Sequence, residues 1–187
     1  DMSAPVAVGG GWLYSCYDYS GPHGWDRAEL QRTDGTAAGT WEVVLDEPWG
    51  VGSQPRALTA RQGGIVFATR EDEWTAVSSD GTEAGTYPLV YTGTGWFGGF
   101  EGGVGLADGE IVFDSLAEDV GEGQLFRTDG DFVSAVGVFD FGQYGPAELT
   151  RVGDAVFFVA DSLWKTDGTA NGTTVVRFEL SGFGLTD

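Results

Sequence analysis

The chain has 187 residues, 41% of them hydrophobic and 13% aromatic, which suits one folded domain and argues against disorder. Its 29 acidic and nine basic side chains give a formal charge of −20, which repels phosphate backbones and anionic lipid. Nucleic-acid binding is therefore not expected, and no apolar run is long enough for a membrane-spanning helix. The single cysteine, Cys16, excludes an internal disulfide. The 32 glycine residues indicate many turns.

An Asp-Gly pair recurs four times along the chain, at intervals of roughly 40–50 residues, which is the signature of an internal repeat. Three of the four copies continue into a second Gly-Thr, and the third copy lacks it, so we expect its hairpin to be shorter or altered. The Asp residues of these expected turns are Asp34, Asp80, Asp129 and Asp167. We interpret 1–187 as one domain built from repeats 4–50, 51–100, 101–142 and 143–187.

Each repeat contains short segments rich in Val, Phe, Tyr, Trp and Leu, separated by Gly or Asp-Gly, a pattern typical of strands joined by hairpins. Asp-Gly suits such turns because Gly accepts positive φ and Asp can bond its own backbone. In chain order, the aligned segments are 5–8, 12–14, 29–32 and 41–45; then 55–59, 65–67, the segment around Val77 and 87–91; then 104–107, 111–113, 124–127 and 133–139; and finally 146–150, 155–157, 162–165 and 174–178.

Four antiparallel strands in a repeat of roughly 40–50 residues match one blade of a β-propeller. We therefore predict an all-β fold, a β-propeller of four four-stranded antiparallel blades. A β-sandwich is the rival fold, but it does not explain a repeat that recurs once every four strands. Two arrangements of the blades stay open, a closed four-bladed ring and a part of a larger propeller.

The segment from Ser162 to Thr173 resembles the Glu-Leu-Trp-x-x-Asp-Gly-Thr-x-x-Gly-Thr repeat of predicted secreted or surface proteins of bacteria, and 29–40 is a second good copy. The resemblance implies a β-propeller and an extracellular or cell-surface location. It implies no particular reaction, since the motif marks a hairpin. The turn also resembles the Asp-box hairpin of sialidases, which is likewise structural, so the four Asp residues are expected to be structural turn residues.

Loops between the second and third strands, and connections between blades, are expected to share one end of the propeller. Their lengths differ between repeats, and variable loops on a constant scaffold commonly carry binding sites. Aromatic rings beside carboxylates and amides suit stacking on sugars. The alternative is that these rings only cover the blade ends. The expected ligand-binding residues are Tyr17, Tyr19, Trp25, Trp49, Trp96, Phe97 and Tyr144.

An acidic group in the third variable loop, formed by Asp114, Glu118 and Asp119, is a candidate metal site. Hard cations such as Ca²⁺ bind carboxylate and carbonyl oxygens, so Ca²⁺ is the cofactor that this group would suit. The alternative is a solvated acidic surface, and the predicted fold requires no cofactor. His23 is the only histidine, which argues against a His-rich zinc site and a Ser-His-Asp triad, and no catalytic residue is nominated.

The sequence thus favours a non-enzymatic, secreted or cell-surface binding module whose partner is a glycan or another protein chain. Two alternatives stay open. One is a structural subunit of a larger ring, fibre or surface layer. The other is a glycan-active hydrolase, which would need two carboxyls across a cleft.

Overall fold

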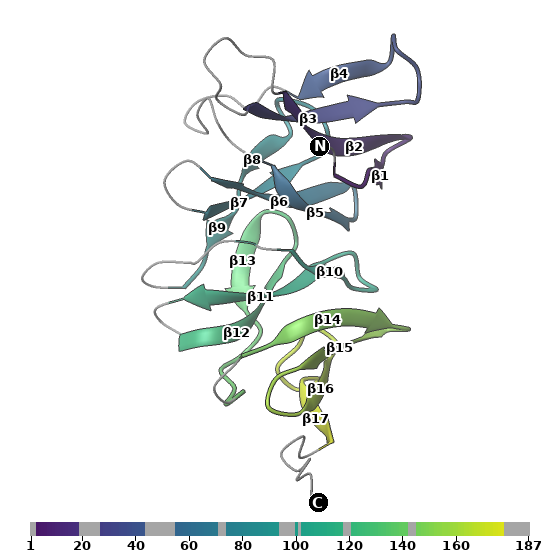
Figure 1. Ribbon diagram of the computed structural model, residues 1–187. Coiled ribbons are helices and arrows are strands. Elements are labelled where there is room, and N and C mark those ends of the chain that lie inside the picture. Colours follow the sequence, from purple (N-terminus) through teal and green to yellow (C-terminus); the bar gives the residue numbers. More distant parts are fainter. Residues whose placement is uncertain are drawn as a thin grey trace, which may run out of the picture.

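A computed structural model describes residues 3–18, 27–43, 55–70, 74–93, 100, 102–117, 121–141 and 145–177. These residues form β-strands joined by turns, and they contain no helix. The strands are arranged in four sheets, stacked one on the next along the chain (Figure 1). We call them sheets 1 to 4 in chain order. Their first strands, β1, β5, β10 and β14, contact one another in succession.

Each sheet takes its four antiparallel strands from one of the sequence repeats, in the order in which they occur along the chain. Sheet 1 contains β1 (Val6–Val8), β2 (Gly11–Asp18), β3 (Arg27–Thr33) and β4 (Thr40–Val43). Sheet 2 contains β5 (Arg56–Arg61), β6 (Gly64–Arg70), β7 (Trp74–Ser79) and β8 (Thr86–Pro88). Sheet 3 contains β10 (Val104–Gly105), β11 (Ile111–Ala117), β12 (Gly121–Thr128) and β13 (Phe132–Ala135). Sheet 4 contains β14 (Ala147–Val152), β15 (Ala155–Val159), β16 (Leu163–Thr166) and β17 (Thr174–Arg177).

Sheet 3 has a fifth strand, formed by the end of the segment 87–91 that we expected as one strand of the second repeat. The short strand β9 (Val90–Tyr91) follows sheet 2 in the chain but pairs with β13 in parallel, opposite Phe132 and Val133. The second repeat therefore completes the outer edge of the third, which joins the two sheets through backbone hydrogen bonds as well as side chains.

The core lies between the sheets, with one apolar cluster at each of the three junctions. In β6, Ile65 and Phe67 belong to the cluster shared with sheet 1, whereas Val66 and Ala68 belong to the cluster shared with sheet 3. A strand that is buried on both faces needs apolar residues at successive positions, and 65–68 is such a run. Full burial of each large side chain contributes about 1.5–3 kcal/mol.

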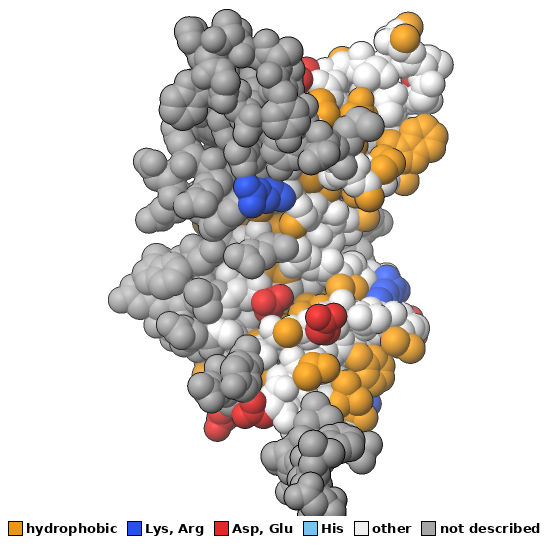
Figure 2. Space-filling model, viewed as in Figure 1, with side chains coloured by type: hydrophobic (Ala, Val, Ile, Leu, Met, Phe, Trp, Pro, Cys, Tyr) orange, Lys and Arg blue, Asp and Glu red, His pale blue; other side chains and the backbone are white. Residues whose placement is uncertain are grey.

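The stack is open within the described residues. Figure 1 shows sheets 1 and 4 at opposite ends, so the closed four-bladed ring, one of the two expected arrangements, is not what the described strands form. Figure 2 shows hydrophobic side chains gathered over β14–β17 at the lower right, on the terminal sheet. In the part of the chain that the structure describes, no helix could cross a membrane.

Strand register corrects our alignment of the fourth repeat by one residue. Val156 pairs with Thr166 in the way that Ile111 pairs with Thr128, so Val156, and not Ala155, begins the equivalent triplet. The buried aromatic of sheet 4 is consequently Phe158, with 1% of its surface exposed. Phe157, which we had aligned with the buried aromatics of the other repeats, points to the opposite face of the sheet.

Candidate functional site

The strands of all four sheets begin and end at two opposite sides of the stack, and these two sides differ in construction. We call the side that carries the Asp-Gly turns and the turns between first and second strands the turn end, and the opposite side the loop end. The hairpins between second and third strands all open at the loop end, because their last cross-strand pairs lie there. These last pairs are Asp18 with Arg27, Arg70 with Trp74, Ala117 with Gly121, and Val159 with Leu163.

The Asp-Gly turns of sheets 1, 2 and 4 share one hydrogen-bond network. In sheet 2, Oδ1 of Asp80 accepts bonds from the backbone N–H (2.8 Å) and the hydroxyl (2.7 Å) of Thr82. The Thr82 hydroxyl oxygen accepts from the N–H of Gly85 (3.0 Å), and Thr86 donates to the Thr82 carbonyl (2.6 Å). The same bonds occur around Asp34 and Asp167.

The second glycine of the motif is explained by this network. A Cβ at Gly85 would overlap the carboxylate of Asp80, and the same holds at Gly39 and Gly172. In sheet 3 the second Gly-Thr is missing and the hairpin is shorter, as expected. There Oδ1 of Asp129 accepts directly from the N–H groups of Asp131 (2.9 Å) and Phe132 (3.0 Å).

Hydrogen bonds hold the pKa values of all four turn aspartates below the ordinary range for the residue. The Thr82 hydroxyl is the main cause at Asp80, and the equivalent hydroxyls act at Asp34 and Asp167. At Asp129 burial raises the pKa, but the bonds from Phe132 and Asp131 outweigh it. These carboxylates are therefore ionised, and their oxygens accept hydrogen bonds within the turn. Their role is structural.

The structure places the expected ligand-binding residues only in part. Tyr17 lies in β2, next to the last pair of the first hairpin at the loop end, and pairs with Ala28. The other six expected residues lie outside the described part of the chain. They are Tyr19, Trp25, Trp49, Trp96, Phe97 and Tyr144.

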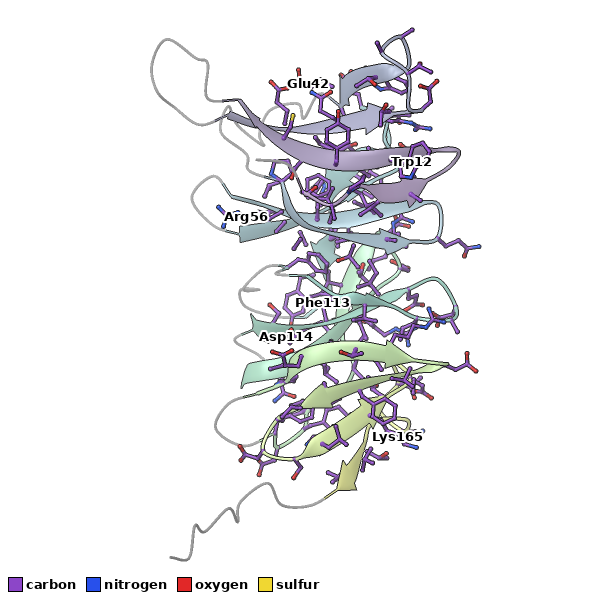
Figure 3. The ribbon with its side chains drawn as sticks, turned by 45° about the vertical axis from the view of Figure 1, so that its right-hand side comes forward. Trp12, Glu42, Arg56, Phe113, Asp114 and Lys165 are labelled. Atoms are coloured by element: carbon purple, nitrogen blue, oxygen red, sulfur yellow. The ribbon has the colours of Figure 1, made fainter. Side chains whose placement is uncertain are left out.

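The candidate metal site is described at one residue. Asp114 is half-buried in β11, opposite Leu125 in β12, while Glu118 and Asp119 lie outside the described residues. Figure 3 shows Asp114 on the third sheet beside Phe113. Among the residues that the structure describes, no three His, Cys, Asp or Glu side chains gather as metal ligands.

A shallow hollow of about 560 Å³ lies where the first strands of sheets 2, 3 and 4 meet. It is lined by Thr59 to Gln62, by Val104 to Gly109 and by Arg151. The guanidinium groups of Arg61 and Arg151, which line the hollow, donate hydrogen bonds to backbone carbonyls of the protein. Arg61 donates to the Gln62 carbonyl (2.9 Å), and Arg151 donates to the Gly105 carbonyl (3.0 Å). The hollow is therefore a groove beside the inner strands whose cations hold neighbouring backbone.

Sequence reasoning missed a set of arginine contacts between neighbouring sheets. Arg32 of β3 donates to the carbonyl oxygen of Asp80 (3.1 Å), and Arg127 of β12 donates to that of Gly168 (3.1 Å). Both arginines occupy the position two residues before the Asp of their own Asp-Gly turn. A basic residue stands at this position in three of the four repeats, with Lys165 in sheet 4, and this recurrence was the sequence signal that could have indicated the contacts.

Comparison with known proteins supports the fold alone. No protein-family model matches the chain, and no curated protein matches it. Among solved structures, the crystal structure of a mutant puromycin hydrolase complexed with PGG matches 96% of this chain, with a TM-score of 0.59 and 18% sequence identity. The chain spans 29% of that protein's length. The hydrolase has a β-propeller domain, so the likeness supports a propeller-like stacking of the four sheets.

Proposed function

We propose that the chain is a non-enzymatic recognition module, a set of β-propeller blades that binds a glycan through its loop end, outside the cell or at its surface. The observation that carries the proposal is the difference between the two ends. Four hairpins open at the loop end. Three of them have three residues each between their strands, so the length difference that we expected holds only for the first, which has eight between Asp18 and Arg27. Loops that vary on a constant scaffold commonly carry binding sites.

The Asp-Gly turns at the turn end are the constant part of this scaffold. They have their carboxylate and hydroxyl groups bonded within the turn, so these side chains have little capacity left for a ligand. Aromatic residues of the sequence concentrate instead in segments that leave the loop end. Flat apolar rings beside a few polar groups suit the faces of sugars. The extracellular location is supported by the sequence resemblance alone.

The proposal is tested by replacing aromatics at the loop end and at the turn end. Trp25→Ala, Trp49→Ala and Trp96→Ala should each weaken binding to a panel of polysaccharides and oligosaccharides, measured by titration calorimetry. Trp41→Ala is the matched control, because Trp41 is 47% exposed in β4 near the turn end and packs under Arg32. Equal affinity for all four variants would refute the assignment of the loop end.

The alternative of a glycan-active hydrolase would need two carboxyls across a cleft. The likeness to a puromycin hydrolase does not favour it, since at 18% identity that likeness shows the fold and not the reaction. Turnover of a polysaccharide, abolished by one carboxylate substitution, would favour the hydrolase over the recognition module.

A further inference from the structure

Each junction between sheets is built around the Asp-Gly turn of the following sheet. At the first junction, Arg32 of sheet 1 reaches the carbonyl oxygen of Asp80, and a Cβ at Gly81 would lie 2.9 Å from its Nη1. At the third junction, Arg127 of sheet 3 donates to the carbonyl oxygen of Gly168, one residue further along the turn than the acceptor of Arg32. At the first junction the turn glycine leaves room for the arginine, whereas at the third a Cβ at Gly168 would overlap Leu106.

The middle junction places a different arginine beside the turn. Ser78 replaces the arginine of the repeat, and Arg61 of β5 donates to its hydroxyl oxygen (2.8 Å). The guanidinium of Arg61 then lies against Gly130, where any Cβ would overlap it. An arginine from another strand therefore lies beside the turn where the repeat position has changed to serine.

The exposure of the turn glycines shows which turns are covered by a preceding sheet. Gly81, Gly130 and Gly168 are buried under the preceding sheet, whereas Gly35, in sheet 1, is exposed. All four have positive φ, between 87° and 102°, so the turns are alike and only their cover differs. Among the described residues, no preceding sheet covers the Asp34–Gly35 turn. This turn is therefore exposed where the equivalent turns receive a neighbouring sheet.

Sheet 4, the last sheet of the stack, carries the basic side chain that would make such a contact. Lys165 occupies the position of Arg32 and Arg127 and is exposed on the face of sheet 4 that points away from sheet 3. On the same face, Val159 is 36% exposed and Phe157 is half-buried. Figure 3 shows Lys165 and Trp12 at opposite ends of the stack, along the same side.

We propose that two copies of this chain join head to tail, with sheet 4 of one copy packed on sheet 1 of the other. Lys165 donates to the carbonyl oxygens of the partner's Asp34–Gly35 turn. Phe157 and Val159 pack against Trp12 and Tyr14, which take the positions that the buried Ile65 and Phe67 hold in sheet 2.

A second copy is the occupant because both halves of the contact belong to this one chain and follow the pattern of its first and third internal junctions. Trp12, with 43% of its surface exposed, lies beside Gly35, 3.8 Å from where a Cβ would be, so the receiving turn has an apolar neighbour. Such heterologous contacts generate rings when the rotation closes. Two copies would supply eight sheets, and propellers have roughly four to eight blades.

Charge sets the conditions for assembly. Each copy carries −20, so repulsion opposes association at low ionic strength, while the contact itself is mainly apolar. At physiological ionic strength the Debye length is about 8 Å, which screens most of this repulsion. We therefore expect association to strengthen as salt is added, the reverse of a contact held by ion pairs.

The mass in solution, measured by light scattering across protein concentrations and ionic strengths, tests the proposal. Twice the monomer mass of 19.8 kDa, or a longer head-to-tail series, is expected at high protein concentration and at physiological salt. A mass of 19.8 kDa under every condition would overturn the proposal.

Two variants at the end face and one control locate the contact. Lys165→Glu and Val159→Asp should each raise the dissociation constant about tenfold or more, because they place a carboxylate in an apolar interface. Val138→Asp is the control, since Val138 is 73% exposed in the segment after β13, and it should leave the mass unchanged. Assembly that survives both end-face variants overturns the proposal, and circular dichroism establishes that each variant is folded.

Chemical cross-linking gives a second readout, because Lys165 is the only lysine of the chain. A carbodiimide should couple its amine to the carboxylate of Asp34 in another copy, and mass spectrometry should find this pair in the species of doubled mass. Coupling of Lys165 only to carboxylates outside sheet 1 would contradict the head-to-tail arrangement. The proposal is independent of glycan binding, which is measured by affinity and not by mass, so either can fail alone.

Discussion

Arg127 in β12 donates a hydrogen bond from Nη1 to the carbonyl oxygen of Gly168 at 3.1 Å, across the junction between sheets 3 and 4. The same guanidinium donates from Nε to Oε2 of Glu110 at 2.5 Å, within its own sheet. One side chain therefore joins two sheets beside an apolar cluster that includes Val112 and Val156. A guanidinium suits this position because its planar fork serves two acceptors at once.

Removal of this side chain should destabilise the junction. We expect Arg127→Ala to lower the free energy of unfolding by about 1–3 kcal/mol, because the Gly168 carbonyl and the Glu110 carboxylate lose their partner. Arg127→Lys should recover only part of the loss, since a single ammonium replaces the fork. Urea denaturation measures both, with Val138→Ala as an exposed control. A loss for Arg127→Ala no larger than that of the control would contradict the role of the contact.

The second glycine of the turn motif should be needed only while the aspartate is present. Gly85→Ala should destabilise the protein by more than the roughly 1 kcal/mol typical of a point substitution, because its Cβ displaces the Asp80 carboxylate. In an Asp80→Ala background the same change should cost less, since the obstruction is gone. A double-mutant cycle by urea denaturation measures this coupling, and additive losses would argue against it.

The Asp-Gly turns were predictable from the sequence because their bonds are local. Asp80 reaches Thr82 two residues on, and Thr82 reaches Gly85 three residues further. Contacts between sheets are of another kind, since Arg32 and Asp80 are 48 residues apart. A repeat alignment indicates that the arginine position recurs, but it does not indicate which turn the side chain reaches.

The register of the fourth repeat was beyond the sequence for a related reason. Val156, Phe157 and Phe158 are all apolar, so a slip by one residue leaves an equally plausible pattern of apolar positions. Pairing of Val156 with Thr166 decides between the two, and it turns Phe157 outward and Phe158 inward. Likewise, the apolar pattern of 87–91 predicts one strand, and it does not indicate that Val90 and Tyr91 leave sheet 2 to pair with β13.

Two phenylalanines of sheet 3 provide a matched test of the core. Phe126 is fully buried and stacks on Phe113 at 5.9 Å, whereas Phe132 is 52% exposed. Phe126→Ala should lower the free energy of unfolding by about 3–5 kcal/mol through lost burial and the cavity left behind. Phe132→Ala should cost far less, and equal losses in denaturant unfolding would contradict the stacked-sheet core.

Acid should weaken the fold through the turn aspartates. The pKa of Asp167 is lowered in the folded protein, first by the Thr169 hydroxyl and then by the Thr169 N–H, so its ionised form is favoured by folding. The stability that it contributes is present above the unfolded pKa of about 3.9 and is lost as the pH falls through the lower folded value.

The difference in stability between the wild type and Asp167→Asn should therefore be constant above about pH 4 and shrink below it. Thr169→Val removes the main cause of the shift, so it should raise the pKa of Asp167 and move the loss to higher pH. Urea denaturation as a function of pH measures the first effect, and an NMR titration of the carboxylate carbon measures the second. A stability difference that does not change with pH, or a titration unaffected by Thr169→Val, would show that the hydroxyl bond does not favour the ionised turn.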